Sequence, residues 1–128
     1  TGAAVDLGGW KLHKRSGTGA DYSLRTIPAG SAIAAGGYFT WANSAGGFAD
    51  LVGADISSSE TLSAGNSVAL FDADGAVVDE LAWGGGVNQY VEGDPYPTDP
   101  EANQVLARKQ SGGAMVDTGD NASDFFIQ

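Results

Sequence analysis

The chain of 128 residues contains no cysteine and only one histidine. Without cysteine, no disulfide bond can contribute to its stability. No apolar stretch approaches the roughly 18 residues that indicate a membrane span. Residues 1–20 carry no signal-peptide pattern, so we expect any export signal to lie upstream or to have been removed. These absences exclude a disulfide scaffold and a membrane-inserted protein.

Basic residues are also scarce: six lysines and arginines stand against sixteen acidic residues, giving a formal charge of -10 and a pI near 4.1. Such a surface repels phosphate backbones and anionic lipids, so we expect no binding to nucleic acid or to a membrane surface. The same charge suits a bound cation or a basic partner.

Helical periodicity is absent, whereas strand periodicity recurs. Trp10 and Leu12 alternate with polar neighbours, and Tyr22 and Leu24 do the same in the next segment. The run at 38–42 is nearly all apolar, so we expect a strand that is covered on both faces. A hydrophobic fraction of 42% supports a folded chain, and the twenty glycines separate the apolar runs as turn residues do.

The strongest local pattern is a β-hairpin. Residues 68–71 and 76–83 form two apolar runs, and the Asp74-Gly75 pair between them is typical of a tight turn. A long loop is expected at 84–103. Two final short strands are expected at 105–109 and 125–127. About seven short strands with frequent turns predict an all-β fold, a β-sandwich within one domain over 1–128.

Five segments, in this order, resemble the lamin tail domain of bacterial secreted and surface proteins. They are DLGGWKL at 6–12, TIPAGSAIAAGGYFTWAN at 26–43, SVALFDADGAVVDELAWG at 67–84, LARK at 106–109 and DTGDNASDF at 117–125. The resemblance implies an immunoglobulin-like β-sandwich. It also implies an accessory module found beside nucleases, phosphatases or surface anchors, without an activity of its own.

The chain departs from that family at its start. Family members open with one or two strands before the DLGGW-like segment, and this sequence begins after them. Three explanations are open: the sequence is a fragment, the strand comes from elsewhere in the same protein, or another subunit donates it. A sandwich without a core strand exposes an apolar groove and unpaired backbone groups.

No set of residues predicts catalysis. His13 is expected on the polar face of its strand, there is no cysteine nucleophile, and no G-x-S-x-G motif occurs. Asp79 occupies alternate positions with Leu81 and Trp83 along the expected strand and therefore shares their face. It is expected to point inward and to accept hydrogen bonds in a structural role. Trp10 and Trp41, like Trp83, are expected to pack in the core rather than to form a carbohydrate platform.

The acidic loop, residues 117–124, holds the densest cluster of oxygen ligands. We predict a calcium site there because calcium prefers carboxylate and amide oxygens. The predicted ligands are Asp117, Asp120, Asn121 and Asp124. The alternative is that these side chains cap turns. Asp72 and Asp74 make a weaker candidate, since the hairpin already accounts for them.

The loop from Tyr90 to Glu101 combines two tyrosines, four acids and three prolines, and it is either a contact-making loop or a solvated connection. As a whole, the sequence predicts a noncatalytic extracellular or cell-surface module for protein contact or surface attachment. Two alternatives remain: a filament or layer subunit assembled from identical copies by strand donation, and an accessory domain of a secreted hydrolase.

Overall fold

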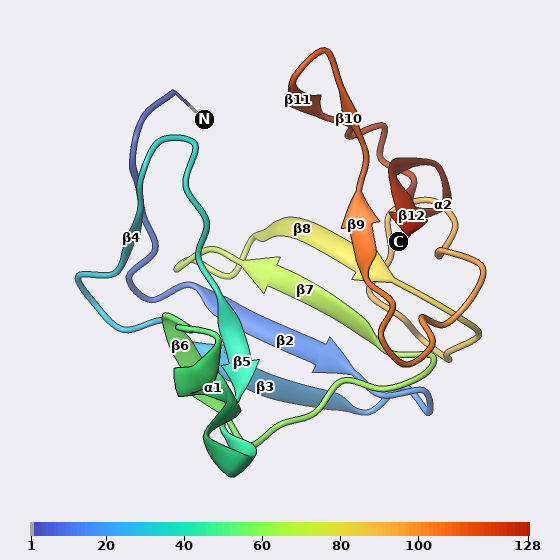
Figure 1. Ribbon diagram of the computed structural model, residues 1–128, viewed down its shortest axis with the longest axis horizontal. Helices are drawn as coiled ribbons and strands as arrows, with labels where there is room; N and C mark the ends of the chain where they lie inside the picture. Colours follow the sequence, from blue (N-terminus) through green and yellow to red (C-terminus); the bar gives the residue numbers. More distant parts are fainter. Residues whose placement is uncertain (1) are drawn as a thin grey trace. The chain divides into compact units, whose positions relative to one another are not determined.

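The computed structural model describes residues 2–128, and within this range the chain forms twelve short strands, one 3-10 helix and two short α-helices (Figure 1). The elements of the first half are β1 (Val5–Asp6), β2 (Lys11–Arg15), β3 (Asp21–Thr26), β4 (Ala32–Ile33), β5 (Trp41–Asn43), η1 (Ala45–Gly47), α1 (Phe48–Leu51) and β6 (Ile56–Ser58). Those of the second half are β7 (Ser67–Phe71), β8 (Val77–Ala82), β9 (Leu106–Arg108), β10 (Gln110–Ser111), β11 (Ala114–Met115), α2 (Asn121–Asp124) and β12 (Phe125–Ile127). None of the described helices has the length and hydropathy needed to cross a membrane.

The largest sheet has four strands in the order β3-β2-β7-β8 (Figure 1). The predicted hairpin joins β7 to β8. Its turn is held by Asp72, whose side-chain oxygen accepts hydrogen bonds from the backbone nitrogens of Asp74 at 3.0 Å and Ala76 at 2.8 Å. Gly75 adopts φ of 89°, a left-handed conformation that glycine reaches without strain. The hairpin prediction is confirmed, and Asp72 has a structural role in it.

The contacts within the chain group into two compact units, and each is described by itself. The first unit comprises residues 1–13, 23–61 and 70–79; the second comprises 14–22, 62–69 and 80–128.

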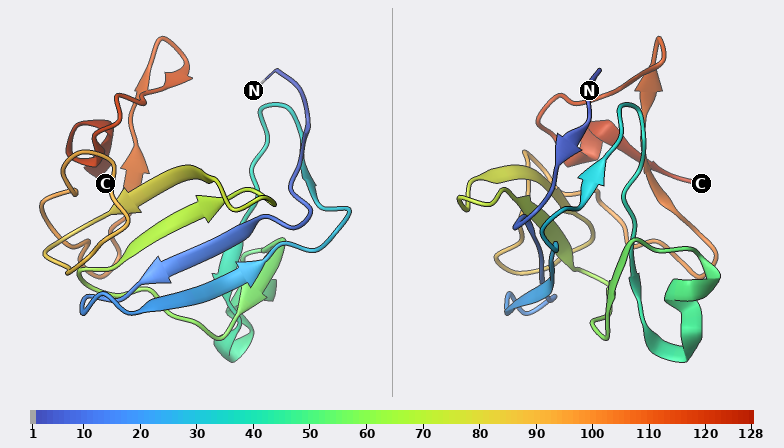
Figure 2. Two further views of the ribbon diagram at one scale, coloured as in Figure 1. Left: turned by 180° about the vertical axis from the view of Figure 1, so that it is seen from behind. Right: turned by 90° about the vertical axis from the view of Figure 1, so that its left-hand side faces the viewer.

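The first unit contains two further pairs of strands. β1 and β4 are antiparallel, with Val5 opposite Ile33, and lie side by side in both views of Figure 2. β5 and β6 are parallel, with Trp41 opposite Ile56. Leu7, Ile27 and Ile56 form the buried core of this unit, because each of these apolar side chains leaves less than a tenth of its surface exposed.

The second unit contains the antiparallel pairs β9–β12 and β10–β11. Leu24 of β3, which belongs to the first unit, was expected to be buried and is 2% exposed. Tyr22 at the start of the same strand, in the second unit, is 44% exposed and lies under the ammonium group of Lys14, 5.1 Å from the ring centre. The aromatic ring therefore serves a cation–π contact rather than the core.

The expected fold class is confirmed: the protein is all-β and of the immunoglobulin-like sandwich type. The structure differs in detail, since residues 2–128 contain five further short strands that the sequence did not predict: β1, β4, β6, β10 and β11. The expectation of a strand over 38–42 covered on both faces is wrong. The strand starts at Trp41, and Tyr38 is 81% exposed because a tight turn, closed by the hydrogen bond from Gly37 N to Ala34 O, precedes it.

Candidate functional site

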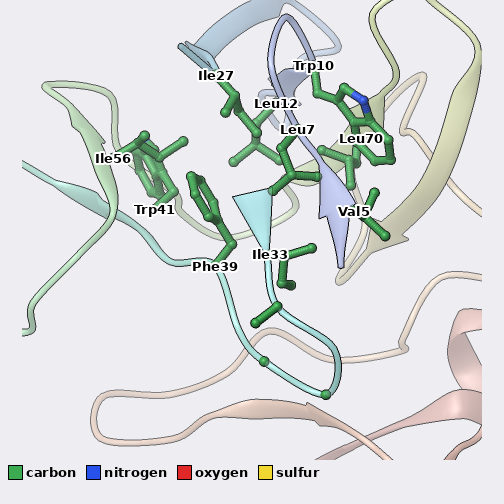
Figure 3. A pocket seen from close by; sticks show the side chains of 13 residues that line it. Val5, Leu7, Trp10, Leu12, Ile27, Ile33, Phe39, Trp41, Ile56 and Leu70 are labelled. Atoms are coloured by element: carbon green, nitrogen blue, oxygen red, sulfur yellow. The ribbon is translucent and has the colours of Figure 1, made fainter. Parts of the chain in front are cut away.

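The first unit contains an apolar cavity of about 420 Å³ (Figure 3). Its lining comes from six strands and the segments next to them, and all lining residues belong to this unit. They are Val5, Leu7, Trp10, Leu12, Ile27, Ile33, Ala34, Gly36, Gly37, Phe39, Trp41, Ile56 and Leu70.

The cavity walls are the inward faces of strands. Val5 and Leu7, Trp10 and Leu12, and Phe39 and Trp41 are each two residues apart, the spacing at which side chains share one face of an extended chain. In Figure 3, Phe39, Trp41 and Ile56 face Trp10, Leu12 and Leu70 across the cavity. Trp41 and Ile56 belong to the β5–β6 pair, and Phe39 precedes β5. Leu12 and Leu70 belong to β2 and β7 of the four-stranded sheet, and Trp10 directly precedes β2.

Energetics indicate that this space is open. An enclosed void costs about 24 cal/mol per Å³, so a sealed cavity of 420 Å³ would cost about 10 kcal/mol, as much as the whole stability of a typical domain. The opening lies at Ala34, Gly36 and Gly37, which line the cavity and are exposed. The exposed ring of Tyr38 follows them directly in the sequence.

The chemistry of the cavity is that of a binding surface. None of its lining side chains is titratable or carries a charge. It has no group able to take up or release a proton, and a charged ligand placed in it would lose its hydration without compensation. The cavity therefore suits apolar side chains or apolar molecules.

The predicted calcium ligands lie around α2, in the second unit. Asn121 is fully buried: its side-chain oxygen accepts from Ala82 N at 2.9 Å, and its amide nitrogen donates to Glu80 O at 3.0 Å. Asp124 is also fully buried and accepts hydrogen bonds from the backbone nitrogen of Thr118 at 2.8 Å and from its hydroxyl at 2.7 Å. These oxygens cap turns and tie the acidic loop to β8.

The other two predicted ligands lie nearer the surface. The Asp120 side chain accepts from Asp94 N at 2.9 Å and from the Ser123 hydroxyl. The largely exposed Asp117 carboxylate lies 3.7 Å from Arg108. Residues 2–128 hold no group of three histidine or acidic side chains arranged to bind a metal. Calcium binding at the acidic loop stays a prediction.

Hydrogen bonding lowers the pKa of two carboxyl groups in the acidic loop. Donation from Ser123 and from the Asp94 amide lowers the pKa of Asp120. For Asp124, burial by itself raises the pKa, but the Thr118 hydrogen bonds and the positive charge of Arg108 outweigh it and lower the pKa. Both carboxylates are therefore held in the charged form.

The remaining candidates have structural positions. His13 is half-buried and packs edge-on against Phe71, with ring centres 5.6 Å apart. Asp79 is half-buried on β8. Trp10 and Trp41 pack against the core of the first unit, and Trp83 is 8% exposed and donates to Ser63 O at 3.0 Å.

The loop that follows β8 is anchored within the second unit. The Tyr90 hydroxyl donates to Asp21, and the Arg15 guanidinium lies 3.9 Å from the Tyr90 ring centre and 3.4 Å from the Asp21 carboxylate. Burial, and then the Asp21 hydrogen bond, raise the pKa of Tyr90 to about 12. Further along, Asp99 accepts from Gly65 N at 2.6 Å. Tyr90 and Asp99 therefore serve as fixed anchors of the loop.

The cavity itself was not predicted as a site. Alternation predicted that Trp10 and Leu12 face inward, and the departure from the family pattern predicted an apolar groove. Val5, Ile33 and Leu70 carried no such signal, because their apolar character is equally typical of a filled core.

In comparison with known families, the model of the family described as Lamin Tail Domain matches residues 1–85. This range includes every residue that lines the cavity. No curated protein and no solved structure matches the chain.

Proposed function

The chain belongs to the lamin tail domain family, and on this premise we propose that it is a noncatalytic extracellular module for protein contact or surface attachment. The open apolar cavity of the first unit is the observation that carries the proposal. Resemblance to bacterial secreted and surface members of the family supports the extracellular setting.

The cavity has the properties of a contact surface for protein. Its lining includes Trp10, Phe39 and Trp41, and aromatic side chains are enriched at the centres of protein interfaces. Tyr38, which directly follows the lining residue Gly37 in the sequence, is 81% exposed. Its missing acid and base groups support a role in binding rather than in catalysis.

A second candidate is a structural subunit that builds a filament or layer by strand donation. An apolar space between the inward faces of strands is what a donated strand would fill. An accessory role beside a secreted hydrolase is compatible with the same cavity, since the module would then position its neighbour.

A photocrosslinking experiment tests the proposal. The photoreactive amino acid p-benzoylphenylalanine replaces Phe39 at the cavity or, as the control, Val87, which is 62% exposed in the second unit. We expect position 39 to form adducts with extracellular proteins of the source cells. Mass spectrometry identifies the crosslinked partner, and binding is then reconstituted with the purified partner. Adducts no more frequent at position 39 than at position 87 would contradict the proposal.

A further inference from the structure

We infer that the cavity binds an extended segment of a partner protein, with apolar side chains at alternate positions and basic residues at its ends. The inference rests on the function proposed above and names the chemistry of the partner. The segment adds to the β5–β6 sheet, and its apolar side chains fill the cavity.

The volume and lining of the cavity define the side chains it accepts. An apolar cavity of about 150 Å³ holds one benzene molecule. A cavity of 420 Å³ accordingly has room for about two or three branched aliphatic side chains. Because no lining side chain is charged, a charged side chain could enter only at the cost of its hydration.

The sheet structure defines the conformation of the segment. β5 and β6 form a parallel pair, and no third strand joins them within residues 2–128. Parallel strands normally occur in larger sheets, and an isolated pair is marginally stable. An added strand extends this pair through backbone hydrogen bonds and presents alternate side chains to the cavity.

A helix fits this space less well. An α-helix with its side chains is about 10–12 Å across, as wide as the roughly 10 Å that separates packed sheets. A helix would therefore have to force the walls formed by Trp41 and Leu70 apart. An extended chain needs only the space that its side chains fill.

The charge of the first unit defines the ends of the segment. This unit holds seven acidic and two basic residues, a formal charge of -5. Asp6 lies between the lining residues Val5 and Leu7, and Asp55 directly precedes Ile56. Basic ends complement this field and speed association, whereas a second copy of the chain, itself at -10, is repelled.

A peptide titration of the whole chain tests this inference. The probe is a ten-residue peptide with valine and isoleucine alternating with threonine, and lysine at both ends. Trp10 and Trp41 line the cavity, so their emission reports entry of apolar groups. We expect a blue shift that saturates with peptide. Two peptide controls are used: the same residues with the apolar ones grouped together, and the alternating sequence with glutamate ends. Both should bind at least tenfold more weakly.

Two variants locate the binding. Ala34 lines the cavity at its opening, so Ala34→Phe places a ring where the peptide side chains bind and should weaken binding at least tenfold. Ala76, exposed in the β7–β8 turn, gives the matched variant Ala76→Phe, which should bind within twofold of the wild type. Cooperative thermal unfolding of both variants shows that they are folded.

Each contrary result is distinguishable. Equal binding by the grouped peptide, or unchanged binding by Ala34→Phe, overturns the extended segment in the cavity. A wild-type dimer that Ala34→Phe abolishes identifies a second copy as the occupant and overturns the choice of partner. Adducts at position 39 without peptide binding overturn this inference alone, whereas the absence of both overturns the proposed function as well.

Discussion

Replacing Asn121 by alanine should destabilise the protein, because its side chain connects the acidic loop to β8. The side chain is fully buried and makes two hydrogen bonds to the backbone, with Ala82 N and Glu80 O. A buried backbone group deprived of its partner costs about 1–3 kcal/mol. The loss of both hydrogen bonds should therefore reduce the free energy of unfolding by about 3 kcal/mol.

Urea denaturation measures this loss. With a urea dependence of about 1–3 kcal/mol per M, the midpoint of Asn121→Ala should fall by about 1–3 M. The control is Gln110→Ala in exposed β10, which should change the free energy of unfolding by less than about 0.5 kcal/mol. A loss below about 1 kcal/mol for Asn121→Ala would refute the tethering role, since one unsatisfied buried amide alone should exceed it.

Three further predictions concern the second unit. Gly86→Ala should destabilise by about 3 kcal/mol in urea denaturation, because its Cβ would lie 2.0 Å from Gly65 O, whereas its neighbour Gly85→Ala, with nothing within 4 Å, should cost less than about 0.5 kcal/mol; equal effects would contradict this packing. Because the pKa of Tyr90 is raised from 10.0 to about 12, the stability it contributes is present below pH 10 and lost between pH 10 and 12. Denaturation across that range should show a smaller loss for Tyr90→Phe than for the wild type, and identical pH profiles would refute the raised pKa of Tyr90. For the predicted calcium site in the acidic loop, we expect millimolar calcium to raise the melting temperature of the wild type but not of Asp120→Asn, and the absence of any shift in the wild type would eliminate the site.

The sequence predicted those parts of the fold that depend on local signals. The Asp74-Gly75 turn, the buried Leu24 and the C-terminal strand at 125–127 follow from turn chemistry and alternation, and each is present in the structure. The exposure of Tyr38 was not predicted, because an apolar run does not show which of its side chains will point to solvent after a tight turn.

The acidic loop and the cavity both depend on contacts between segments that are far apart in the sequence. Such contacts could not be predicted from local sequence patterns. The oxygen atoms of Asn121 and Asp124 made a plausible ligand set in the sequence. Only the structure shows that an amide 39 residues away, at Ala82, donates to Asn121. Likewise, the apolar residues at Ile33 and Leu70 predict burial, but whether facing strands fill the space between them is a property of the packed structure.

The proposed function requires that a partner bind at the cavity of the first unit. Methyl NMR of the whole chain, recorded as the alternating peptide is added, tests it most directly. We expect shifts for the methyl groups of Ile33, Ile56 and Leu70, which line the cavity, and none for Val87 and Val105 in the second unit. Saturable binding that shifts Val87 or Val105 and leaves the three cavity residues unchanged would contradict it.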